Sequence, residues 1–306
     1  MLQKNYTIRR CRFKKDLTVT QTESITLPQP VGEKMQCMEV WGGNRSTWSQ
    51  FTVPGLDLWI HSEPYLRNNE GGDVYYLSSC ASGRITRMLL ADVSGHGAAV
   101  APVAVELRDL MRKNINFVSQ SRLVKSLNDE FESISEEGAF ATALVSTFFS
   151  PTRTLSLCNA GHPMPVIRRA SIGRWERCDT GLSETPMRNL PIGIFDSGDY
   201  RSGKLVLSPG DMVLSYTDSL SESQKENGEL INPQGVCDLL QDIDVAQPEL
   251  IVPALLSKIR GLNAANLSSD DTTVMLLKAN GTGVRFIENF KAPFRLLRGL
   301  FTRKSK

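Results

Sequence analysis

The order of strand-like and helical segments is the feature that most constrains this fold. Apolar runs rich in β-formers occupy 56–61, 74–79 and 85–92, and turn residues separate them. Two stretches with helical spacing of apolar residues follow, at 98–115 and 120–134. Because strands and helices come in blocks and do not alternate as βαβ units do, we predict antiparallel sheets with helices packed on their outer faces, an α+β class.

The flanking segments extend the same pattern. A strand-like piece at 37–41 is followed by a predicted turn at 42–44. Two helices predicted in the second half each have a proline near the first turn, although Pro253 is expected to kink the second. These helices cover 233–243 and 248–262, and the later strands are predicted at 141–149, 155–158, 165–168, 204–207, 212–216 and 273–278.

Composition divides the 306 residues into three parts. Residues 1–30 are polar and are interpreted as an N-terminal extension, 31–279 as one domain, and 280–306 as a basic amphipathic tail. A formal charge of +2 is too small to indicate binding to nucleic acid or to a membrane. The six scattered cysteines, and the lack of a signal peptide or of a run of about 18 apolar residues, predict a cytoplasmic protein with reduced thiols.

Carboxylates recur beside apolar runs that are far apart in the chain. A single loop aspartate is usually a turn or helix-cap residue, but four in the same setting predict one shared site. Oxygen ligands of this kind favour hard cations such as Mg²⁺ or Mn²⁺ over zinc. The residues are Asp73 after two glycines, Asp92 before 93–97, Asp218 after 213–216, and the pair Asp270 and Asp271 before the last strand.

Convergence of these carboxylates demands positive charge. If two of them stand about 5 Å apart at an effective dielectric near 20, they repel each other by roughly 3 kcal/mol. Two divalent ions bridged by one carboxylate relieve that repulsion and hold a water suited to in-line attack on a phosphate ester. The sequence therefore predicts a binuclear metal site for phosphate chemistry.

Seven short blocks, taken in order, resemble one known family. They are 71–73, 91–97, 159–163, 190–193, 209–211, 216–218 and 270–273. Over about residues 55–279 the chain resembles the SpoIIE-like (RsbU-like) branch of the metal-dependent PPM, or type 2C, protein phosphatases. The resemblance implies an αββα sandwich of two antiparallel sheets flanked by helices, and a pair of Mn²⁺ or Mg²⁺ ions.

The resemblance also implies roles for individual residues. Asp92 bridges both ions. Together with Asp73 it is assigned a catalytic role, in which the water held between the ions is the nucleophile. The carbonyl of Val93 binds the second ion. Asp218 and Asp270 complete the site, and Asp270 is preferred over Asp271 because the family's ligand is the first of that pair. The two helices after the Asp92 loop, 98–115 and 120–134, act as a switch in the family.

The chain departs from the family pattern at two places. Ser219 stands where the family usually has glycine, which predicts a shift of Asp218 without its removal. The segment 64–70 lacks the usual proline-alanine lead-in. Among the histidines, His96 is a weak candidate for the general acid, whereas His162 and His61 are interpreted as structural.

The resulting hypothesis is a serine/threonine protein phosphatase that acts on a phosphorylated regulatory protein. By analogy with the family, a STAS-type anti-sigma-factor antagonist is the candidate partner, and nucleic acid is not expected. The alternatives are a catalytically inactive phosphatase-fold module that binds a phosphoprotein, and a metal-dependent nuclease or phosphodiesterase. Residues 285–306, with seven basic residues and one acidic residue, are a candidate contact for an anionic membrane surface or a partner.

Overall fold

The structure is a computed structural model that describes residues 31–34, 40–80, 83–95, 100–134, 139–178, 189–194 and 200–283. The predicted N-terminal extension, His96 and the basic segment 285–306 lie outside these residues. Within them, no helix is long and apolar enough to cross a lipid bilayer.

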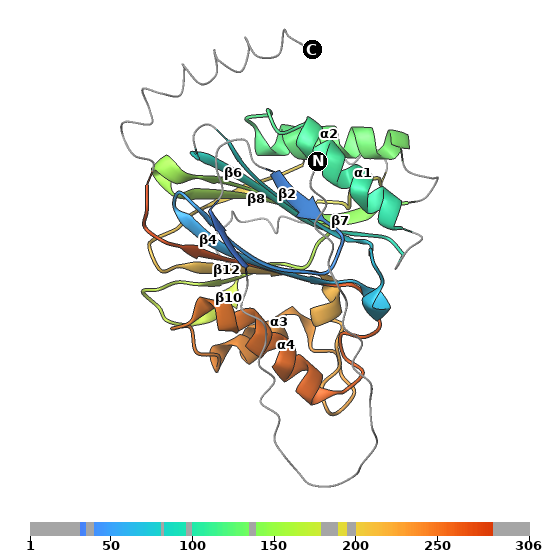
Figure 1. Ribbon diagram of the computed structural model, residues 1–306, viewed down its shortest axis with the longest axis vertical. Helices are drawn as coiled ribbons and strands as arrows, with labels where there is room; N and C mark the ends of the chain where they lie inside the picture. The colour runs from blue at the N-terminus through green and yellow to red at the C-terminus, as the bar shows by residue number, and fades with distance from the viewer. Residues whose placement is uncertain are drawn as a thin grey trace, which may run out of the picture.

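Two β-sheets face each other in the middle of the described chain (Figure 1). The pairs of strands are antiparallel, except that β1 runs parallel to β3. The seven-stranded sheet has the order β1 (Val31–Lys34), β3 (Thr47–Val53), β4 (Leu56–Glu63), β13 (Thr272–Ala279), β12 (Met212–Tyr216), β9 (Val166–Arg168) and β10 (Trp175–Arg177). The six-stranded sheet has the order β11 (Gly203–Val206), β8 (Thr154–Ala160), β7 (Ala141–Phe149), β6 (Ile85–Val93), β5 (Asp73–Cys80) and β2 (Val40–Gly43).

A pair of helices covers the outer face of each sheet. Helices α1 (Ala101–Lys113) and α2 (Gln120–Ile134) pack on the six-stranded sheet, and α3 (Asn232–Gln241) and α4 (Ile251–Leu262) on the seven-stranded sheet (Figure 1). Short 3-10 helices are η1 (Tyr65–Arg67), η3 (Ser150–Thr152), η4 (Asp218–Leu220) and η5 (Pro248–Leu250). The predicted αββα sandwich is therefore confirmed.

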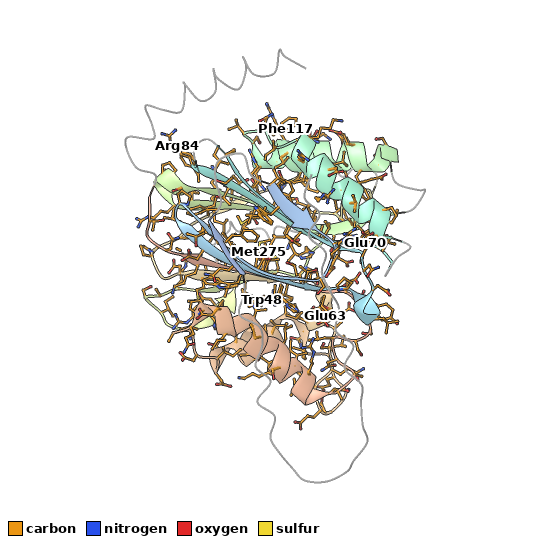
Figure 2. All side chains as sticks on the ribbon, viewed as in Figure 1. Trp48, Glu63, Glu70, Arg84, Phe117 and Met275 are labelled. Carbon is orange, nitrogen blue, oxygen red and sulfur yellow. The ribbon has the colours of Figure 1, made fainter. Side chains whose placement is uncertain are left out.

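Strands β5 and β6 are buried on both faces, which explains their apolar runs at 74–77 and 88–91. Tyr75 and Leu77 face the core between the sheets, where Met275 of the opposite sheet also lies (Figure 2). Val74 and Tyr76 point the other way, into the core under α1 and α2. This alternation places every second residue of β5, beginning with Asp73, on the face between the sheets.

Two local predictions were wrong, and one strand was missed. Two of the three residues of the turn expected at 42–44 are strand, because Gly42 and Gly43 pair with Tyr76 and Tyr75 in the ladder, and the chain bends only at Asn44. Helix α4 runs through Pro253 without interruption, since this proline is its third residue and needs no intrahelical N–H partner. Strand β10 was missed, and its three residues are too few for a periodic signal.

Burial favours the neutral form of two histidines, His162, which is buried, and His61, which is partly buried. Burial lowers the pKa of His61 on β4 to about 4, despite the nearby carboxylate of Glu63. Burial likewise lowers the pKa of His162 to about 3. The ring Nδ1 of His162 lies 2.9 Å from the hydroxyl of Thr142, and Asn159 brackets its backbone with two hydrogen bonds of 2.9 Å. His162 thus braces the end of β8, as its sequence context predicts.

We expect acid to destabilise the fold through His162. A histidine whose folded pKa lies below the unfolded value near 6.5 stabilises the fold above that value, and this stabilisation is lost as the pH falls toward the folded pKa. The free energy of unfolding should fall by about 1.4 kcal/mol per pH unit from this group between about pH 6 and pH 4. Urea unfolding of the wild type and His162→Gln at several pH values measures it, and an identical pH dependence in both would contradict the prediction.

Candidate metal centre

Asp73 and Asp92 form the centre of the candidate site. They are direct partners in the antiparallel ladder between β5 and β6, so their side chains lie side by side on the face between the sheets. Asp73 is buried, and Asp92 is partly exposed. Two strands that are paired along their whole length hold these carboxylates, which gives the pair a rigid support.

The other sheet contributes Asp218 and Asp270. Asp218 follows β12 as the first residue of η4, and Asp270 lies two residues before β13. Because β12 and β13 are antiparallel, with Tyr216 opposite Val274, the two loops meet at the same edge. The structure therefore brings together carboxylates from segments that are almost two hundred residues apart.

The charges of this cluster act on one another. Burial raises the pKa of Asp92 to about 8, and the carboxylates of Asp218 and Asp270 add to this effect. Burial also raises the pKa of Asp73 well above its usual value, with Asp92 as the next cause. Burial raises the pKa of Asp218 as well, and the carboxylate of Glu222 adds to this effect. Each carboxylate thus makes its neighbours harder to ionise, as like charges in a partly dry site do.

Thr217 connects the two sheets at this edge. Its fully buried hydroxyl donates a hydrogen bond of 2.8 Å to Asp73 Oδ2 and accepts one of 2.9 Å from the backbone N–H of Thr273. The backbone N–H of Thr217 also donates to the Thr273 carbonyl, at 3.0 Å. Sequence reasoning missed Thr217 and Glu222, and their closeness to Asp218 in the chain was the one available signal.

Asp271 has a structural role that differs from the role of its neighbour. Its buried carboxylate accepts backbone N–H bonds from Tyr65 and Gly72, each of 2.6 Å, and a longer one of 3.4 Å from Asp73. A Cβ atom at Gly71 would collide with this carboxylate, so a glycine is required there. The two glycines before Asp73 therefore make room for Asp271, in addition to letting the chain turn.

Asp270 stands apart from this network of backbone amides. It is partly exposed, accepts a 2.8 Å hydrogen bond from the backbone N–H of Asp271, and acts on the charge of Asp92. Because Asp271 accepts the backbone amides of Tyr65 and Gly72, Asp270 is favoured as the metal ligand of the pair. That assignment stays a prediction.

Ser219 is accommodated without strain. It lies inside η4, its side chain is buried, and its backbone does not adopt the left-handed conformation that requires glycine. Its backbone N–H contributes a hydrogen bond to Asp218. The departure from the family's glycine therefore leaves Asp218 at the edge of the sheet.

The chemistry of these donors fits a hard divalent cation. The cluster offers carboxylate oxygens, and the Val93 carbonyl lies over the turn, 3.2 Å from the position of a Cβ atom at Gly72. Within the described chain, no three His, Cys, Asp or Glu side chains are grouped closely enough to surround one ion. Mg²⁺ commonly binds one or two carboxylates and keeps several waters, so a closed protein cage is not required.

The sandwich has the fold of PP2C-type phosphatase domains. The family model for Stage II sporulation protein E (SpoIIE) matches residues 82–280, and the chain belongs to this family. Phosphoserine phosphatase RsbP of Bacillus subtilis (strain 168) is 24% identical over 199 residues, which are 62% of this chain and 45% of RsbP. Phosphoserine phosphatase RsbU of the same organism is 22% identical over 222 residues, which are 72% of this chain and 63% of RsbU. The chain thus spans less than two thirds of either relative.

Solved structures show the same fold. The RsbU and RsbW domains of Rv1364c from Mycobacterium tuberculosis match with a TM-score of 0.61 and 24% identity, over 75% of this chain and 61% of that one. RsbX in complex with magnesium matches with a TM-score of 0.54 and 14% identity, over 76% of this chain and 99% of that one.

Replacement of Thr217 by valine should destabilise the protein. The change keeps the shape of the side chain but leaves the buried Thr273 N–H and one oxygen of Asp73 without their partner, at a cost of about 1–3 kcal/mol. Thr217→Ser keeps the hydroxyl and serves as the control, with a smaller loss. Urea unfolding at pH 7 measures both, and equal stabilities of the two variants would contradict the role given to the hydroxyl.

Proposed function

We propose that this chain is a metal-dependent protein serine/threonine phosphatase. The observation that carries the proposal is the meeting of the Asp73–Asp92 pair of one sheet with Asp218 and Asp270 of the other. Carboxylates that raise one another's pKa at a partly exposed edge destabilise the free protein, and a bound cation would explain their arrangement.

The candidate ligands are the carboxylates of Asp73, Asp92, Asp218 and Asp270 and the Val93 carbonyl, with Asp92 as the bridging group. Two Mn²⁺ or Mg²⁺ ions bound there would supply an activated water and a Lewis acid for hydrolysis of a phosphate ester. Thr217 orients Asp73 through its hydroxyl, and Asp271 holds the turn that presents Asp73. Glu222 adds negative charge beside Asp218 and raises the demand for cations.

The proposed substrate is a phosphorylated regulatory protein. The names of RsbP and RsbU as phosphoserine phosphatases support phosphoserine chemistry. A STAS-type anti-sigma-factor antagonist remains the candidate for this chain by family resemblance. The cytoplasmic location, the exclusion of nucleic acid and the contact through 285–306 also stay predictions.

The alternative is an inactive phosphatase-fold module that binds a phosphoprotein. Such a module commonly lacks metal ligands, whereas each predicted carboxylate ligand is present at the acidic edge. This supports the enzyme over the module, and a turnover experiment separates them.

Full-length protein with Mn²⁺ should release phosphate from a phosphoserine peptide, and Asp92→Asn should lower kcat by at least about 100-fold because the bridging charge is lost. Asp244→Asn, an exposed aspartate after α3, is the matched control and should keep wild-type activity. Phosphate release measures both. Absence of turnover in the wild type with either ion would overturn the proposed activity.

Metal binding can be measured without turnover, through the free energy of unfolding. Mn²⁺ at about 100 times its dissociation constant should add about 2.7 kcal/mol to the free energy of unfolding, and Asp92→Asn should remove this gain. Stabilisation without turnover would identify the inactive module.

Substitution of Asp271 should change the stability of the metal-free protein, whereas substitution of Asp270 should change activation by Mn²⁺. Asp271→Asn weakens the acceptor for the Tyr65 and Gly72 amides and should destabilise the metal-free protein by about 1–3 kcal/mol. Asp270→Asn should leave the metal-free protein as stable or more stable, because it removes a repulsive charge, while it weakens activation by Mn²⁺. Urea unfolding in EDTA and Mn²⁺ titration of activity measure the two effects. The reverse pattern would assign Asp271 as the ligand.

A further inference from the structure

We infer that a groove between helix α1 and the edge strand β2 binds a small phosphate-bearing anion. The groove, here called the α1–β2 groove, has a cavity volume of about 320 Å³. It lies on the outer face of the six-stranded sheet, whereas Asp73 and Asp92 face the other sheet. Figure 1 shows β2 beneath α1 on this side. The lining residues are Val40, Gly42, Tyr76, Arg108, Asp109 and Arg112.

Two arginines supply the positive charge of the groove. Arg108 and Arg112 are four residues apart on α1 and therefore lie on one face of the helix. Arg108 donates to Asp109 Oδ1 at 2.9 and 3.1 Å, but Asp109 is exposed and Arg108 partly exposed, so water weakens this ion pair. Arg112 forms no hydrogen bond or ion pair with the described part of the chain. With Asp109 included, the groove keeps one net positive charge.

The floor of the groove contains a buried hydroxyl that lacks a partner. Tyr76 is fully buried, and its hydroxyl makes no hydrogen bond within the described residues. Ser78, two residues along the same strand face, is close enough to affect the pKa of Tyr76, but its hydroxyl is also without a hydrogen-bond partner there. A buried polar group is normally satisfied, so this hydroxyl indicates a missing acceptor. The charge of Arg112 reaches the same hydroxyl.

Gly42 keeps the groove open. A Cβ atom there would lie 2.7 Å from the Tyr75 carbonyl oxygen and 3.4 Å from Arg108 Cδ, so a side chain would push β2 away from β5 and occupy space beside Arg108. The two guanidinium groups and the hydroxyl are all hydrogen-bond donors. Guanidinium forks match the oxygens of phosphate, which accepts several such bonds at once. A free phosphate ion and a small phosphate ester share this chemistry. The inference does not depend on the proposed phosphatase activity.

Calorimetric titration of the full chain with inorganic phosphate, O-phosphoserine and acetate tests the groove. The ionic strength is kept constant, and the titrations are made in EDTA and again with Mg²⁺. In EDTA the acidic edge holds no cation that could attract an anion, so saturable phosphate binding under that condition reports the groove. We expect phosphate to bind at least about 10-fold more tightly than acetate. Tighter binding of O-phosphoserine than of phosphate would identify an ester as the ligand, and equal binding would identify the free ion.

Substitutions locate the binding. Arg112→Gln should weaken phosphate binding by at least about 10-fold, and Tyr76→Phe by about 5-fold. Arg122→Gln, an exposed arginine on α2, is the matched control and should bind as the wild type does. Tyr76→Phe should melt at or above the wild-type temperature without phosphate, because the lost hydroxyl had no partner. No saturable binding, equal binding of acetate, or wild-type binding by both groove variants would overturn the inference.

Discussion

Repulsion among buried carboxylates is the constraint on which the rest of this structure depends. Asp73 and Asp92 stand side by side, and their surroundings raise the pKa of both. A flexible support would let the side chains swing apart into water. The ladder between β5 and β6 prevents this, because both residues belong to strands that are paired along their length. The rigidity of the sheet thus maintains an arrangement that is electrostatically unfavourable by itself.

The anchors around the cluster are neutral donors. The Thr217 hydroxyl and the backbone amides of Tyr65 and Gly72 hold Asp73 and Asp271 without adding a positive side chain. An arginine in the same place would have neutralised the site and removed its attraction for cations. Neutral anchors fix the geometry while leaving the negative charge for an ion. This separation of positioning from charge compensation is what a metal site needs.

Much of this arrangement could be predicted from the sequence. Strands β5, β6 and β12 were recognisable because burial on both faces gives each of them an apolar run, and an aspartate lies at or just beyond one end of each strand. The bond between Thr217 and Asp73 could not be predicted, since it joins residues 144 positions apart through a hydroxyl that carries no motif of its own. Gly42 was misread as a turn because its local preference is overridden by pairing with β5, whose backbone approaches Gly42 closely.

The alternation of β5 keeps two kinds of charge apart. Asp73 and Tyr76 lie three positions apart on one strand and therefore point to opposite faces of the sheet. The inner face holds the acidic edge, and the outer face holds the groove with Arg108 and Arg112. Apolar side chains of the two cores fill the space on both sides of the strand, so water and salt cannot screen charges across it as they do at the surface. An anion in the groove and a cation at the edge would accordingly attract each other through the sheet, because charges interact more strongly through a dry interior than through water.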